Sequence, residues 1–237
     1  MPLGLIAATA LRIADCEAIR DGTLRQPSNA ISSLALLVAA VWITRRASRV
    51  PAERPELITL AVIVAANGVG SFAFHGPLGP SARWFHDLAA LSIPSFIAIH
   101  DTGLVRGTPV DRRLWMLAAC LAVIGCLLAA WPDLLVPLGL LGAGAAGAGE
   151  LAAFRAGYRP RPGQATRSQI VAWALVLGTI TLAGLAFVLG RSESAWCRPA
   201  SWFQFHAAWH AMVALSSIAF AWAAFELRGI PASRQDG

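Results

Sequence analysis

The sequence predicts an all-α integral membrane protein, a bundle of seven transmembrane helices. Of its 237 residues, 57% are hydrophobic and only 14% are charged, whereas about a quarter of the residues in a typical soluble domain are charged. Apolar runs close to the ~20 residues that a spanning helix needs recur along the whole chain. We therefore expect one membrane domain over residues 1–237 and no separate soluble domain.

Links that contain Pro, Gly and Arg separate the seven apolar runs. The expected spans are 30–44, 57–76, 84–105, 114–131, 133–154, 169–190 and 201–225. The fourth and fifth runs touch at Pro132, where a break is expected because proline interrupts helical hydrogen bonding. Residues 1–29 would form an outer N-terminal segment and residues 226–237 a cytosolic tail.

Arginines predict the orientation. All 19 basic residues are Arg, and thirteen of them lie in the links after the first, third and fifth spans or in the C-terminal tail. Cytoplasmic loops carry an excess of Arg and Lys, so the N-terminus is expected outside and the C-terminus in the cytosol. This topology accounts for the net charge of +6 without a nucleic-acid partner. The Ala, Gly, Arg and Pro-rich composition favours a bacterial inner membrane protein.

Three histidines predict a metal site. His206 and His210 are four residues apart in one apolar run, so they share a helix face, and His75 ends another run. In the predicted topology all three lie near the outer boundary, where three imidazoles can hold zinc. Haem is the alternative ligand for a helix that carries both His86 and His100, although no second helix offers a matching pair.

Two further polar residues lie at the same depth. Asp87 is either a solvated acid at a helix start or a carboxylate that deprotonates a water beside the metal. Ser71, one turn before His75, either permits close helix packing or donates a hydrogen bond to a substrate oxygen. Neighbouring helical residues point about 100° apart, so His86 is expected outside the group of ligands. Cys16 and Cys197 both fall on the outer side, where an oxidising compartment permits a disulfide.

The pattern resembles the alkaline ceramidases, within a wider superfamily of seven-span hydrolases that includes adiponectin receptors and GPI-anchor remodelling proteins. The segments that carry the resemblance are Ser71-x-x-x-His75, Asp87, His206-x-x-x-His210, Asp15-Cys16-Glu17, Gln26-Pro27-Ser28-Asn29 and Gly76-Pro77-Leu78. The resemblance implies zinc on the three histidines, catalytic roles for Asp87 and Ser71, and a Cys16–Cys197 disulfide. It also implies a calcium site at Asp15 and Glu17.

The leading hypothesis is zinc-dependent hydrolysis of the amide bond of ceramide or a related lipid amide, near the periplasmic side, giving a sphingoid base and a fatty acid. Asp87 would move the proton and Ser71 would stabilise the oxyanion. One alternative is a hydrolase of another membrane lipid, an ester or an ornithine-type amide. The other is a seven-span receptor or transporter, whose structural zinc would be closed by a fourth protein ligand.

Overall fold

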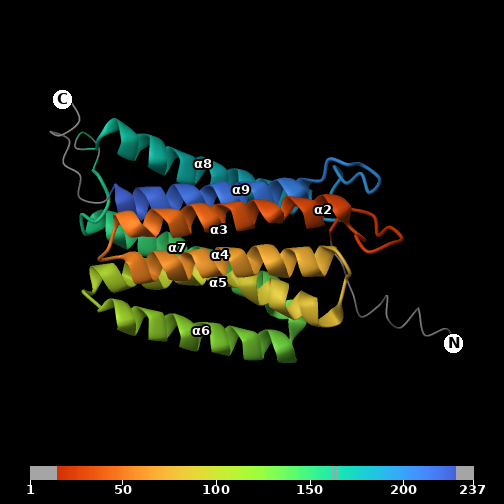
Figure 1. Cartoon of the computed structure of the whole chain (residues 1–237), viewed down its shortest axis with the longest axis horizontal. Coiled ribbons are helices and arrows are strands. Elements are labelled where there is room, and N and C mark those ends of the chain that lie inside the picture. The colour runs from red at the N-terminus through yellow and green to blue at the C-terminus, as the bar shows by residue number, and fades with distance from the viewer. Residues whose placement is uncertain (1–14, 162, 164, 228–237) are drawn as a thin grey trace.

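The computed structural model describes residues 15–161, 163 and 165–227 and forms a bundle of helices (Figure 1). Seven helices are long and apolar enough to cross a membrane. They span Pro27–Arg49, Arg54–His75, Ser81–Val105, Val110–Ala130, Pro132–Arg155, Arg167–Leu189 and Phe205–Glu226. Among the described residues there is no strand, only an isolated bridge between Asp15 and Arg191. The all-α fold with seven spanning helices is therefore confirmed. Most of the expected tail 226–237 and the first half of segment 1–29 lie outside the described residues.

The elements follow one another with short links. In chain order they are α2 (Pro27–Ser32), α3 (Leu34–Arg46), η1 (Ala47–Arg49), α4 (Arg54–His75), α5 (Pro80–Val105), α6 (Val110–Ala130), η2 (Pro132–Leu134), α7 (Leu135–Arg155), α8 (Arg167–Leu189), α9 (Phe205–Ala221) and η3 (Trp222–Glu226). The break expected at Pro132 is present, since the helical hydrogen bonding stops at Trp131 and resumes in η2.

Several helices begin three or four residues before their apolar run does. Proline in the first turn starts α2, α4 and α5, because its missing N–H would have no helical partner there. The first turn of α6 contains Asp111. Its charge places it outside the apolar run, but an acidic side chain is favourable in the first turn of a helix. The seventh span differs in the other direction: residues 201–204 are not helical, and α9 begins at Phe205.

The helices run side by side along the long axis of the molecule, with α8 at one edge and α6 at the other (Figure 1). Helix α5 packs along α4, α6 and α7, whereas α9 packs along α8 and α3. We call the end of the bundle where α4 finishes at His75 and α9 begins at Phe205 the histidine end. The end where α3 finishes at Arg46 and α4 begins at Arg54 is the opposite end.

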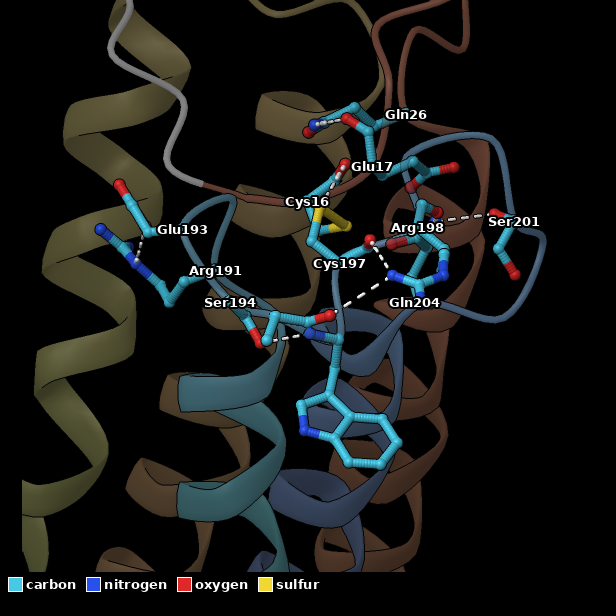
Figure 2. Close-up of a disulfide and its surroundings, with 12 residues drawn as sticks. Cys16, Glu17, Gln26, Arg191, Glu193, Ser194, Cys197, Arg198, Ser201 and Gln204 are labelled. Carbon is cyan, nitrogen blue, oxygen red and sulfur yellow. Dashed lines mark hydrogen bonds and ion pairs between the residues drawn. A yellow bond between two sulfur atoms is a disulfide. The ribbon is translucent and has the colours of Figure 1, made fainter.

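Residues 15–26 lie across the histidine end and are fixed to it by backbone hydrogen bonds. The N–H of Cys16 donates to the carbonyl of Gly190 at 2.8 Å, and that of Gln26 donates to the carbonyl of His75 at 2.9 Å. The Cys16–Cys197 disulfide, predicted from the sequence, joins this segment to the loop between α8 and α9 (Figure 2). Chain segments 181 residues apart are thereby held together above the ends of α4 and α9.

Large apolar side chains cover the outer faces of the bundle. Trp115 on α6, Leu140 on α7 and Leu177 on α8 are all at least 64% exposed. A soluble monomer rarely leaves contiguous apolar faces in water, so these faces suit the hydrocarbon of a bilayer. The chain is a multi-pass membrane protein by the length and composition of its helices.

Candidate metal centre

Four buried histidines meet at the histidine end. His75 is the last residue of α4, His86 lies in the second turn of α5, and His206 and His210 lie on one face of the first two turns of α9. One ring nitrogen from each lies within 4.8 Å of one from every other member of the group. We call this set the histidine cluster. The clustering of His75, His206 and His210 that the sequence predicted is therefore present, with a fourth member added.

The rings stand edge to face around a common centre. The ring centroids of His206 and His210 are 4.9 Å apart, and those of His75 and His206 are 5.0 Å apart. His86 approaches from α5, with its ring centroid 5.5 Å from that of His75. Glycine permits part of this approach, because a Cβ at position 190 would lie only 2.7 Å from the backbone nitrogen of His206.

Each of the four rings has an acceptor beside its Nδ1 atom. The Nδ1 of His75 lies 2.7 Å from Gln26 Oε1, that of His86 lies 2.8 Å from Asp87 Oδ1, and that of His210 lies 2.9 Å from Ser32 Oγ. The Nδ1 of His206 lies 3.2 Å from Asp15 Oδ1, as an ion-pair contact whose angle is outside hydrogen-bond geometry. Such partners fix the tautomer and the orientation of metal-binding imidazoles.

Two of these partners are themselves fixed, which settles the direction of the hydrogen bonds. Gln26 donates its Nε2 to the carbonyl of Glu17 at 2.8 Å, so its Oε1 is the atom that faces His75. Ser32 donates its hydroxyl to the carbonyl of Asn29 at 3.0 Å, so its oxygen accepts from His210. In both rings the proton therefore resides on Nδ1, and the lone pair of Nε2 is free.

The four Nε2 atoms are buried and have no hydrogen-bond partner. A buried polar atom without a partner destabilises a fold by roughly 1–3 kcal/mol, and here four such atoms are gathered in one place. A cation bound by their lone pairs would satisfy all four together. The donor set is nitrogen alone, and zinc, copper, nickel and iron all accept imidazole ligands. The cluster therefore fits a bound transition-metal ion.

His86, which was expected outside the group of ligands, lies within the histidine cluster. His86 and Asp87 do point in different directions, but His86 is the residue that faces the other imidazoles. The carboxylate of Asp87 contacts the far nitrogen of His86 and lies 3.6 Å from Arg83 Nε. Sequence spacing showed that only one of the two neighbours could face the centre, and it gave no means of deciding which.

Ser71 is buried on α4 one turn before His75. Its hydroxyl donates to Asn67 Oδ1 at 3.2 Å, and no direct contact with a histidine is recorded for it among the described residues. Gln26 and Ser32 are the two polar partners that the sequence analysis missed. Their signal was weak, because Gln26 ends the irregular segment 15–26 and Ser32 ends the six-residue helix α2, and neither is long or regular enough for periodicity to identify an inward face.

The acidic residues expected to bind calcium make contacts within the protein. Glu17 accepts the backbone N–H groups of Ser28 and Asn29 at 2.8 and 2.9 Å and so caps the start of α2. Asp15 faces His206. Within the described ranges these carboxylates do not gather into a metal-ligand group.

The haem alternative requires His86 and His100 to bind two haem groups in similar surroundings. His86 belongs to the histidine cluster, whereas His100 lies near the far end of α5, with its Nδ1 2.9 Å from Glu56 Oε1. The two rings therefore have different surroundings: His86 faces the other three imidazoles, whereas His100 faces a carboxylate.

Comparison of the chain with family models, curated proteins and solved structures gave no match.

Proposed function

We propose that this protein is a zinc-dependent membrane amidohydrolase that cleaves ceramide or a related lipid amide into a sphingoid base and a fatty acid. The observation that carries the proposal is the convergence of four buried, unpartnered Nε2 atoms, in rings whose Nδ1 atoms all face acceptors. The resemblance of Ser71-x-x-x-His75 and His206-x-x-x-His210 to the alkaline ceramidases supplies the substrate class.

His75, His206 and His210 hold the zinc ion in this proposal. When bound, zinc lowers the pKa of a water molecule toward neutrality and polarises a carbonyl group. The fourth imidazole, His86, is free to act on the proton. Its Nε2 accepts the proton of the attacking water and later returns it to the leaving amine. Asp87, at the Nδ1 atom, orients the ring and stabilises the imidazolium. The proton-transfer role that the sequence assigned to Asp87 is thus shared with His86.

Ser71 is proposed to assist the substrate carbonyl. Its hydroxyl, which donates to Asn67 in this structure, lies one helical turn before His75 on the same face of α4. When it turns from Asn67 to the carbonyl oxygen, it donates a hydrogen bond to the developing oxyanion.

The depth of the site suits an amide-linked lipid. His75 is the last residue of its span and His206 the second residue of α9, so both lie within about one turn of the membrane boundary. The amide of a lipid lies beside its polar headgroup, at that boundary. A soluble amide would gain nothing from a site at the end of seven apolar helices.

The histidine end is proposed to face the periplasm of a bacterial inner membrane. Thirteen of the nineteen arginines fall on the other side in the predicted topology. The Cys16–Cys197 disulfide at the histidine end is in keeping with an oxidising compartment there.

A second candidate is favoured by the presence of the fourth imidazole. Four protein ligands close a tetrahedral zinc site and exclude water, which is typical of structural zinc. If His86 is a ligand, the protein is a seven-span receptor or transporter whose metal ties α4, α5 and α9 together.

The variant His86→Ala separates the two candidates. The metal content of the purified protein and the release of fatty acid from labelled ceramide, other lipid amides and lipid esters would be measured, with His100→Ala as the matched control. The hydrolase proposal expects wild type to be active, and His86→Ala to retain zinc but lose turnover by at least ~100-fold. Loss of zinc in His86→Ala, with no lipid hydrolysed by zinc-loaded wild type, would establish the closed structural site.

A further inference from the structure

An apolar groove runs along the outside of the bundle between α3 and α4, near the opposite end. It has a volume of ≈ 540 Å³, within the ~300–1,000 Å³ range of small-molecule sites in proteins. Its floor includes Ala40 on α3 and Ala61 on α4, which are 6% and 3% exposed. Val41 and Val62 form its rims and are 52% and 62% exposed. Small residues between larger ones thus create a furrow that opens toward lipid.

The groove has a basic end. Arg45, in the last turn of α3, contributes to its lining and is exposed. Its neighbour Arg46 is bound to Glu226, with Nε 2.8 Å from Oε1, and lies over the ring of Trp42. Among the residues that the structure describes, the guanidinium of Arg45 has no ion pair. The same holds for Arg49, in the link that follows.

The groove is separate from the histidine cluster. Ala65, the lining residue of α4 nearest to His75, precedes it by ten residues, which corresponds to about 15 Å along a helix. An occupant of the groove would therefore not be in contact with the candidate metal centre. The groove also lies on the lipid side of α3 and α4 rather than between the packed faces of the bundle.

We propose that this groove binds an anionic phospholipid, with one acyl chain along the alanine floor and the phosphate at Arg45. Water does not stably fill an apolar furrow, and hydrocarbon chains are the apolar molecules that surround a spanning helix. Arg45 lies where α3 reaches the headgroup region, and an unpaired guanidinium binds phosphate oxygens through two parallel hydrogen bonds. Thr44, beside it in the lining, donates its hydroxyl to the carbonyl of Ala40 at 2.9 Å, which leaves Arg45 as the donor to the phosphate. The charge of Arg45 selects an anionic over a zwitterionic lipid.

Native mass spectrometry of the full chain in detergent tests the charged end. Phosphatidylglycerol or phosphatidylcholine would be added in turn, and the lipid retained per chain counted. Wild type should retain phosphatidylglycerol preferentially. Arg45→Ala should reduce its affinity about fivefold, the effect of one arginine near an anionic headgroup. Arg106→Ala is the matched control, because Arg106 is also exposed and unpaired among the described residues, at the end of α5.

A second variant tests the apolar part. Ala65→Trp fills the groove, whereas Ala118→Trp places the same ring on the exposed face of α6. Retained phosphatidylglycerol should fall for Ala65→Trp and stay unchanged for Ala118→Trp, at unchanged melting temperature. Unchanged retention in Arg45→Ala, or equal retention of both lipids by wild type, would overturn the proposal. Competition by soluble glycerol phosphate at equal concentration would also overturn it, because the acyl chain would then contribute nothing.

Discussion

The two ends of the bundle both bury ionisable side chains, but they do so in opposite ways. At the histidine end, four imidazoles direct unpartnered nitrogens toward one another. At the opposite end, carboxylates and guanidinium groups are paired. The same membrane helices α4 and α5 contribute to both ends, so the difference does not come from the depth of burial. It comes from the neighbours of each side chain: imidazoles face imidazoles at the histidine end, and carboxylates face cations at the opposite end.

The opposite end contains two linked sets of ion pairs. Glu56 on α4 lies 2.9 Å from His100 Nδ1 and 3.0 Å from an Nη2 atom of Arg113. Arg159, in the link after α7, binds Glu150 at 2.9 Å and also binds Asp101. These residues come from α4, α5, α6, α7 and the link to α8.

Arg159 is the central cation of the second set. Burial lowers the pKa of its guanidinium, but the hydrogen bonds and negative charges of Glu150 and Asp101 raise it above its usual value overall. It also lies over the ring of Trp173 on α8, 5.0 Å from the centroid. The paired charges therefore hold the helices together, whereas the Nε2 atoms of the histidine cluster have no partner and offer free lone pairs to a cation.

The largest expected effect is loss of metal from the histidine cluster. Purified wild type should contain about one zinc ion per chain, and the double variant His206→Ala/His210→Ala should contain none, because half of the converging lone pairs are removed. Metal analysis by mass spectrometry measures this directly. The matched control His100→Ala alters a buried histidine of the opposite end and should keep its zinc. Full zinc occupancy in the double variant would show that α9 contributes no ligand to the metal.

Arg159→Ala should have the next largest effect, on stability rather than on metal content. It leaves the carboxylate of Asp101 buried without its cation, and removal of one partner of a buried ion pair typically destabilises a protein by about 3–5 kcal/mol. The melting temperature in detergent would fall, while zinc per folded chain stays the same. Arg161→Ala, an exposed arginine in the same link, is the control and should change the melting temperature little. A loss of zinc without loss of stability would contradict the separation of the two ends.

Asp87→Asn should lower turnover of a labelled lipid amide by at least ~100-fold, because the amide cannot stabilise His86 as a cation. Zinc content and melting temperature should stay close to those of wild type. Ser71→Ala should lose less, roughly 10-fold to 100-fold, since one oxyanion donor among several is removed. Turnover near the wild-type rate in Asp87→Asn would refute its part in proton transfer.

The smallest expected effect concerns the disulfide. Cys197→Ser frees the segment that places Asp15 beside His206, and loss of such an orienting partner typically weakens metal binding about 10-fold to 100-fold. We expect a change at the lower end of this range, because the other three Nδ1 contacts remain. Titration with a competing zinc chelator would measure it. Affinity equal to that of wild type would show that Asp15 is held in place without the covalent bond.

The sequence predicted the seven spans well, because a spanning helix must be apolar over its whole length. The same reasoning found His75, His206 and His210, since ionisable residues are conspicuous in apolar runs. It did not place His86 in the cluster, because spacing alone could not decide whether His86 or its neighbour Asp87 faces inward. It also missed Gln26 and Ser32, because the contacts of an irregular segment and of a six-residue helix depend on tertiary packing and leave no periodic signal.

The disulfide between Cys16 and Cys197 also indicates how late in membrane insertion the histidine end is completed. The second cysteine follows the sixth span, so a nascent chain cannot close the bond until six helices have been inserted and both thiols lie on the same side of the membrane. If the histidine end faces the periplasm, as proposed, an inverted chain would present these thiols to a reducing cytosol and would leave residues 15–26 without the disulfide. In that orientation, only a correctly inserted molecule would form the disulfide that holds residues 15–26 over the histidines.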